Sequence, residues 1–184
     1  MKTQTPNPNS AAIKWAVINL VTTIILTYGI QSLNMDPNSS LKYIGYLPFI
    51  LFLILTQKEF QEQLGGYITF GQAFTAGLWY AIFTSLLLAV FIYLYLAVLS
   101  PDVFDKSLAV SQSQMAEKGM SQEQIDKAMG IAKKYGPIIA AVGTVIIDII
   151  FGIIVSLIGA AIVKKERSPF DTPDADYKDP EPTV

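Results

Sequence analysis

The sequence has no cysteine and no histidine. The absence of cysteine excludes disulfide bonds, thiol nucleophiles and haem attachment, and the absence of both residues excludes the usual zinc sites. Acid–base catalysis by histidine is excluded as well. Charged residues are scarce too, since they make up 15% of the 184 residues whereas hydrophobic residues make up 52%. We therefore expect no cofactor and no enzymatic activity.

Four long apolar segments, separated by short polar joints, dominate the chain. A hydrocarbon core about 30 Å thick needs about 20 helical residues to cross it. The segments are continuously apolar rather than alternating, which favours helices over a transmembrane barrel. The predicted fold class is an all-α integral membrane bundle of four transmembrane helices, at about residues 11–31, 40–57, 70–99 and 137–164.

Local signals predict where the helices begin. Thr69 and Gln72 have the spacing of a capping box, which predicts a helix start at residue 70. Gly136 followed by Pro137 predicts that the fourth membrane helix begins there, because proline is favoured at the first helical position.

The second helix is short and is interrupted by Gly45 and Pro48. A short, broken span marks a binding site in some transporters. The more common explanation is a kinked helix whose neighbours compensate for the missing hydrogen bond.

Residues 100–136 are polar but have helical periodicity. Ser100 followed by proline indicates a helix start, Gly119 a helix end, and Ser121 with Gln124 a second capping box. Apolar stripes on both helices predict an amphipathic helical hairpin between the third and fourth membrane helices. Its acidic residues could bind a hard cation, but lysines are interleaved with them and favour a solvated face. These acids are Asp102, Asp105, Glu117, Glu123 and Asp126.

The predicted organisation is a disordered lead (1–10), a membrane domain (11–167) and a disordered acidic tail (168–184). Four crossings would place both termini on one side of the membrane. Basic residues near the membrane are more numerous on that side (Lys14, Lys58, Lys164, Lys165, Arg167) than on the other (Lys42, Lys133, Lys134). The excess predicts that both termini are cytoplasmic.

Three segments carry a resemblance to a known family. They are GGYITFGQAF (65–74), GMSQEQIDKAMGIAKKYGP (119–137) and IVKK (162–165). With them the chain resembles, over roughly residues 10–167, a family of small integral membrane proteins of Bacteroidota, domain of unknown function 4199. The resemblance implies four helices and a multi-pass location in the inner membrane. It implies no activity and assigns no functional residue.

Asp148 lies near the middle of the fourth apolar segment, in VGTVIIDIIFGII. A charged group there costs at least about 2.5–3.5 kcal/mol on insertion scales. One interpretation is a proton or ion relay, with Thr144 and Gly152 one turn away on the same face. The other is a neutral, protonated acid that hydrogen-bonds a neighbouring helix. Intramembrane proteolysis is disfavoured, because it needs a second embedded carboxylate or a histidine base.

Small residues recur in the fourth segment at Gly152, Ser156 and Ala160, which allows close helix packing within the chain or in a homo-oligomer. The leading functional hypothesis is a non-enzymatic scaffold or accessory subunit. It would contact a membrane-protein partner through the hairpin or the acidic tail. The alternative is a small transporter or channel subunit that uses Asp148 and the kinked second helix. Besides the lipid bilayer, we expect a partner protein or a homo-oligomer, and no nucleic acid.

Overall fold

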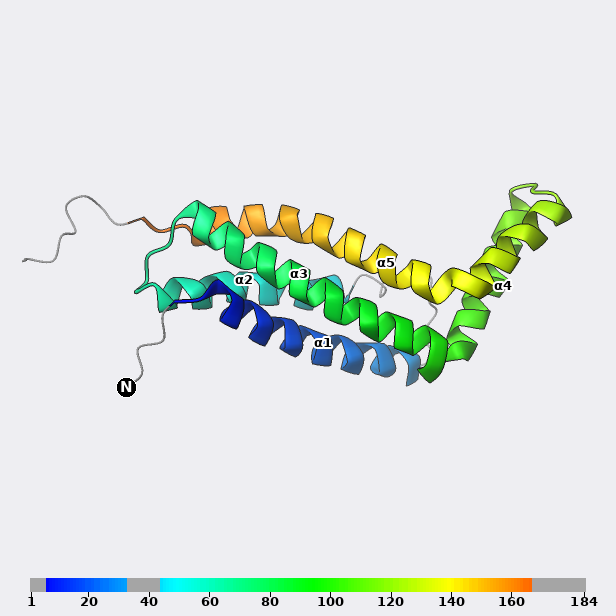
Figure 1. Cartoon of the computed structure of the whole chain (residues 1–184), viewed down its shortest axis with the longest axis horizontal. Helices are drawn as coiled ribbons and strands as arrows, with labels where there is room; N and C mark the ends of the chain where they lie inside the picture. Colours follow the sequence, from blue (N-terminus) through cyan, green and yellow to red (C-terminus); the bar gives the residue numbers. More distant parts are fainter. Residues whose placement is uncertain (1–5, 33–43, 167–184) are drawn as a thin grey trace, which may run out of the picture.

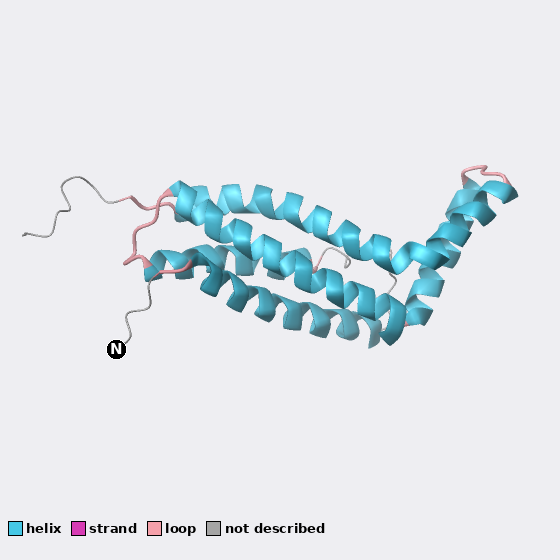
Figure 2. Ribbon diagram, in the orientation of Figure 1, coloured by secondary structure: helices cyan, strands magenta, loops and turns pink. Residues whose placement is uncertain are grey.

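The structure is a computed structural model that describes residues 6–32 and 44–166, and these form a helical bundle with a hairpin projecting from one end (Figure 1). The helices are α1 (Pro8–Ser32), α2 (Tyr46–Gln63), α3 (Phe70–Leu94), a π-helical turn η2 (Tyr95–Leu99), α4 (Pro101–Glu117) and α5 (Gln122–Val163). The described residues form no strand apart from one isolated bridge, and the predicted all-α class is confirmed (Figure 2).

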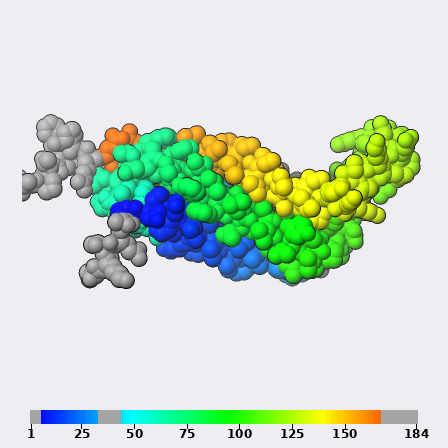
Figure 3. Space-filling model, in the orientation of Figure 1, coloured from blue at the N-terminus to red at the C-terminus, as the bar shows by residue number. Residues whose placement is uncertain are grey.

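The four bundle helices alternate in direction, so that α1 begins and α5 ends at the same end of the bundle (Figure 1). At that end the backbone of Ile68 exchanges two hydrogen bonds with Lys165, with N–O distances of 2.8 and 3.0 Å. This bridge joins the connection between α2 and α3 to the exit of α5. The space-filling view shows an elongated body, with the hairpin at the opposite end (Figure 3).

Large apolar side chains cover the outside of the bundle. Along α1, Ile13, Val17, Val21 and Ile25 recur every four residues and are all exposed, whereas Ala12, Ala16 and Asn19 are buried. After Pro137 the exposed residues of α5 are likewise mostly isoleucines, while Gly152, Ser156 and Gly159 are buried. Lipid is as apolar as isoleucine, so membrane helices pack through small residues and leave large aliphatic ones outside. This arrangement fits a bundle that lies in a bilayer.

Three of the described helices are long and apolar enough to cross a membrane, namely Pro8–Ser32, Phe70–Leu99 and Gln122–Val163. The 18-residue α2 does not join them, because Lys58, Glu59 and Glu62 occupy its last two turns. The described residues therefore supply three candidate crossings, and the fourth crossing stays a prediction.

The start of α1 differs from the prediction. The helix begins at Pro8 rather than at residue 11, with proline in the favoured first turn. The Asn7 side chain accepts a hydrogen bond from the Asn9 amide at 2.9 Å, so asparagine provides the polar group that the first turn needs. Residues 1–5 of the predicted lead and the predicted tail at 168–184 lie outside the described residues.

Both predicted capping boxes are confirmed. The Thr69 hydroxyl accepts from the Gln72 amide at 3.3 Å, and the Gln72 side chain accepts from the Thr69 amide at 3.0 Å. The Ser121 and Gln124 pair makes the same two bonds at the start of α5. These local signals depend only on residues three apart, which explains why the sequence located both helix starts.

The predicted start of a separate helix at Pro137 is wrong. The second hairpin helix and the fourth membrane helix are one continuous helix, the 42-residue α5, with Pro137 inside it. Phe104 of α4 packs so closely on Gly136, the residue before the proline, that a methyl group there would clash with its ring. A proline inside a helix removes one hydrogen bond and bends it. Accordingly, α5 changes direction between hairpin and bundle (Figure 1).

The predicted hairpin is otherwise confirmed. Its two helices meet at Gly119, whose φ of 75° lies in the left-handed region that favours glycine. Leu108 of α4 packs against Ile125 and Met129 of α5, so the hairpin has a small apolar core of its own.

Candidate functional site

A buried glutamine connects three helices at the level where α2, α3 and α5 meet. Gln57 of α2 is fully buried, and its Nε2 donates to the carbonyl oxygens of Ala73 and Ser156 at 3.1 and 3.0 Å. The Ser156 hydroxyl in turn donates to the carbonyl oxygen of Phe74 at 2.9 Å. A hydrogen-bonded amide between apolar helices fixes how they sit against one another. We call Gln57 and Ser156 the amide clamp.

Glycines make room for the amide clamp. A methyl group on Gly77 of α3 would clash with the Ser156 hydroxyl, and one on Gly159 of α5 would clash with Oε1 of Gln57. One turn away, a methyl group on Gly152 would clash with Ala81. The small residues that the sequence singled out in the fourth segment therefore pack within the chain, which is the first of the two alternatives considered for them.

The packing of α5 on α3 places Asp148. The two helices are antiparallel, with Gly152 opposite Ala81. One turn earlier on α5 is Asp148, and one turn later on α3 are Thr84 and Ser85, so these residues lie at one level. Asp148 is half-buried, and its Oδ2 is fully buried with no hydrogen-bond partner among the described residues.

Two further unpaired oxygens come from α3. The hydroxyls of Tyr80 and Thr84 are buried and make no hydrogen bond within the described part of the chain. They are one turn apart, Thr84 is close enough to interact with the Tyr80 hydroxyl, and Tyr80 is within electrostatic range of Asp148. Ser85 differs, because its hydroxyl donates to the Ile82 carbonyl oxygen at 2.9 Å.

A fourth unpaired oxygen comes from α1. Tyr95 donates to Oε1 of Gln31 at 3.2 Å, which sets the register of the parallel helices α1 and α3. Twelve residues back on each helix are Asn19 and Phe83, so Asn19 lies at the level of Thr84. Asn19 is 1% exposed, and its Oδ1 has no partner in the described ranges. We call Asn19, Tyr80, Thr84 and Asp148 the polar cluster.

Unpaired buried oxygens are costly, at about 1–3 kcal/mol for each group. Four such oxygens within about one turn of each other are unusual in a bundle interior. Thr144 and Gly152, which the sequence predicted beside Asp148, add no unpaired oxygen to the polar cluster. Thr144 donates to the Ala140 carbonyl oxygen of its own helix at 2.9 Å, and Gly152 packs on Ala81.

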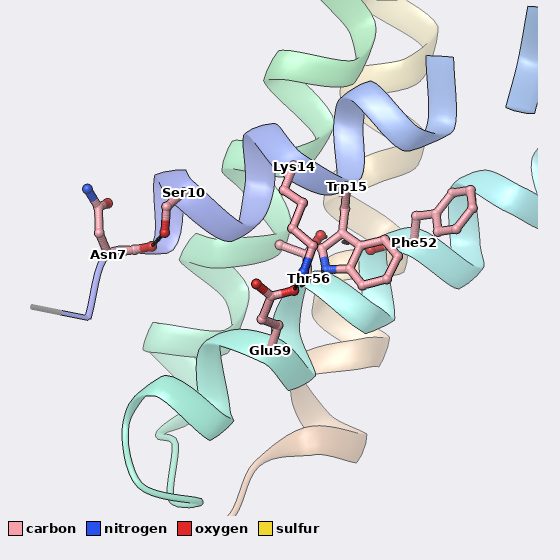
Figure 4. Close-up of polar contacts among 7 residues, drawn as sticks. All are labelled: Asn7, Ser10, Lys14, Trp15, Phe52, Thr56 and Glu59. Carbon is pink, nitrogen blue, oxygen red and sulfur yellow. Dashed lines mark hydrogen bonds and ion pairs between the residues drawn. The ribbon is translucent and has the colours of Figure 1, made fainter. Parts of the chain in front are cut away.

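No basic side chain of the described bundle faces the polar cluster. Helix α3 has no charged residue, and α1 has only Lys14. Lys14 points to α2, where its Nζ lies 2.7 Å from Oε2 of Glu59 (Figure 4). The charges of α2 lie in its last two turns, and those of α5, apart from Asp148 itself, lie in the hairpin segment before Pro137.

The Glu59 site marks the end of the bundle near the two described chain ends. Its Oε2 also accepts from Nε1 of Trp15 at 2.7 Å, and the Trp15 ring stacks on Phe52 (Figure 4). Lys14 is half-exposed while Glu59 is more buried. A lysine and a tryptophan with its polar edge outward are typical of a membrane interface. The site thus suits Lys14 and Trp15 to a position at the membrane interface.

An apolar groove of about 290 Å³ runs between α3 and α5 on the hairpin side of the polar cluster. It begins one turn from Asp148, at Val145, and small residues, Ala89 and Ala141, line it.

Within the described ranges, no three acidic residues gather closely enough to hold a metal ion. The acids of the hairpin are spread out, and Asp102 is 3.7 Å from Lys106 in an exposed ion pair.

A family model matches residues 14–165 of the chain, and its description is a protein of unknown function, DUF4199. The chain belongs to this family. No curated protein and no solved structure matches the chain. The matched region contains the hairpin, the amide clamp, the polar cluster and all of the bundle except the first six residues of α1.

Proposed function

We propose that this protein is a multi-pass protein of the inner membrane, with both termini in the cytoplasm, that acts as a non-enzymatic scaffold or accessory subunit. The apolar exterior of the bundle supports a place in the bilayer. Because α1 begins and α5 ends at the same end of the bundle, an even number of crossings is favoured. The fourth crossing would then come from the segment that contains α2.

The hairpin is the observation that carries the scaffold proposal. It extends from the bundle, and its core of Leu108, Ile125 and Met129 lets it keep its shape without help from the membrane helices. Val110 and Ile131 are about half exposed on its surface. A preformed helical surface loses little entropy on binding, so it suits the presentation of a docking face to a partner.

A photo-crosslinking amino acid at Ile131 in intact cells tests the scaffold role. We expect it to join the chain to one other protein, identified by mass spectrometry after mild detergent extraction. The matched control is the same amino acid at Val21, which is equally exposed but lies on the apolar face of α1 and should capture lipid. A hairpin probe that captures no protein would reject the scaffold.

Single cysteines test the orientation, because the native chain has none. Ser113 in the hairpin and Glu62 at the opposite end of the bundle are both exposed. An impermeant thiol reagent should label Ser113→Cys in intact cells and should label Glu62→Cys only after lysis. The reverse pattern would place the termini outside the cytoplasm.

The polar cluster favours a second candidate function, a small transporter or channel subunit that uses Asp148. Buried oxygens without partners inside an otherwise apolar bundle are characteristic of ion pathways. Reconstituted in liposomes, the protein should carry protons or ions, and Asp148→Asn should abolish that flux. The control Asp126→Asn alters an exposed hairpin carboxylate and should leave the flux unchanged. A flux that Asp148→Asn leaves intact would reject this candidate.

A further inference from the structure

The polar cluster has the charge of a site for one monovalent cation. Asp148 is its only acidic member, and the other three contribute neutral oxygens. One positive charge would make the site neutral, whereas a divalent ion would leave a net positive charge inside an apolar bundle. Isolated charges are strongly disfavoured there. No lysine or arginine of the described bundle faces Asp148, so the described helices supply no balancing charge.

The donors have the chemistry that a hard cation needs. A carboxylate, two hydroxyls and a side-chain carbonyl are all oxygen ligands, which hard cations prefer. They come from three helices, with Asn19 on α1, Tyr80 and Thr84 on α3 and Asp148 on α5. Ligands from three helices surround an ion, whereas ligands from one helix lie only on one side of it.

One ion would also supply a partner to all four unpaired oxygens. Oxygen ligands lie at about 2.4 Å from an ion of this size, so two of them are about 3.4–4.8 Å apart. The four oxygens of the cluster are buried and have no hydrogen-bond partner that the described residues place in good geometry. A protonated Asp148 would neutralise the charge but would leave the other three oxygens unpaired.

We propose that Asn19, Tyr80, Thr84 and Asp148 form a binding site for a monovalent metal cation of the size of sodium. The site would stabilise the contact of α1, α3 and α5 when the ion is bound. It uses the same carboxyl as the transporter candidate, but binding does not require transport. Sodium binding without flux in liposomes would keep the site and reject only the transporter.

Thermal unfolding of the full chain in a mild detergent at pH 8 tests the site. Sodium chloride replaces N-methylglucamine chloride at constant ionic strength. The unfolding midpoint of the native protein should rise with sodium and saturate, because a ligand that binds the folded state stabilises it. Asp148→Asn should abolish the rise. Thr84→Val, which keeps the shape but lacks the hydroxyl, should need about tenfold more sodium for half the rise.

The control is Asp126→Asn, which changes a carboxylate that bonds Gln122 on the hairpin surface and should respond like the native protein. Three results would overturn the site: no rise in the native protein, an equal rise in Asp148→Asn, or a rise that only calcium produces. If Asp148→Asn does not fold, Thr84→Val and Tyr80→Phe decide the matter. A half-saturating sodium concentration that is unchanged in both would overturn the site.

Discussion

The bundle and the hairpin are built from opposite materials. Inside the bundle, small residues and the amide of Gln57 lie beside large side chains such as Phe49, Leu53 and Tyr80, and aliphatic residues, mostly isoleucine and valine, cover much of the outside. The hairpin buries Leu108, Ile125 and Met129 and carries its charges outside. One helix, α5, passes through both regions and changes its pattern on the way. The difference shows that the surrounding solvent, rather than the helix, decides which side chains are buried.

The largest effect is expected where the hairpin core is broken. Ile125→Asp removes a 3% exposed anchor and buries a charge, so it should cost about 4 kcal/mol or more of local stability. Hydrogen exchange across residues 101–135 should become fast while the bundle stays protected. Ile131→Asp, on the exposed side of the same helix, is the control and should change little. Fast exchange of this segment in the native protein would contradict a hairpin with its own core.

Filling the bundle interior should have the next largest effect. Gly77→Ala places a methyl group against the Ser156 hydroxyl and Gln57, so the amide clamp must move, at a cost of about 1–3 kcal/mol. The matched control is Gly143→Ala on α5, where a methyl group meets nothing within 4 Å. Unfolding midpoints in detergent should fall for the first variant and stay or rise for the second. Equal midpoints would mean that α3 and α5 are not packed through glycine.

The sequence predicted the features that depend on neighbouring residues and missed those that depend on contacts between helices. The capping boxes at Thr69 and Ser121 and the turn at Gly119 depend on neighbouring residues, and the structure confirms them. The helix start predicted at Pro137 is wrong, because the contact of Phe104 with Gly136 lies outside the local sequence.

The candidate site was only partly visible for the same reason. Asp148 is conspicuous in the sequence because it is the one charged residue near the middle of an apolar segment. Asn19, Tyr80 and Thr84 come near it only through the way in which three helices pack. A polar residue amid an apolar run, as Asn19 is in α1, was the available signal. The exposed positions four residues apart on α1 show that Asn19 lies on the opposite, inner face. Helical spacing alone could thus have pointed to the interior, although not to Asp148.

Removal of the clamp amide should have a smaller effect. Gln57→Leu keeps the side-chain volume but loses the hydrogen bonds to the carbonyl oxygens of Ala73 and Ser156. These two oxygens lie within helices, where they can still accept a backbone hydrogen bond. Hydrogen bonds between membrane helices contribute about 1 kcal/mol, so the midpoint should fall by less than in Gly77→Ala. Gln61→Leu is the control, since its single bond to the Val163 carbonyl oxygen lies at the bundle end. A Gln57→Leu protein more stable than the native one would mean that the clamp serves specificity alone.

The smallest effect is expected at the boundary between lipid and water, where Lys14 pairs with Glu59. Glu59→Gln removes the ion pair with Lys14 but keeps an oxygen for the Trp15 indole. Because Lys14 is half-exposed, water and salt weaken the pair, and the loss should stay below about 1 kcal/mol. As the salt concentration rises, the unfolding midpoint of the native protein should approach that of the variant, because salt screens the attraction between Lys14 and Glu59 that the substitution abolishes. A loss that is large and independent of salt would instead place Lys14 and Glu59 inside the hydrocarbon, and would move the membrane boundary toward the chain ends.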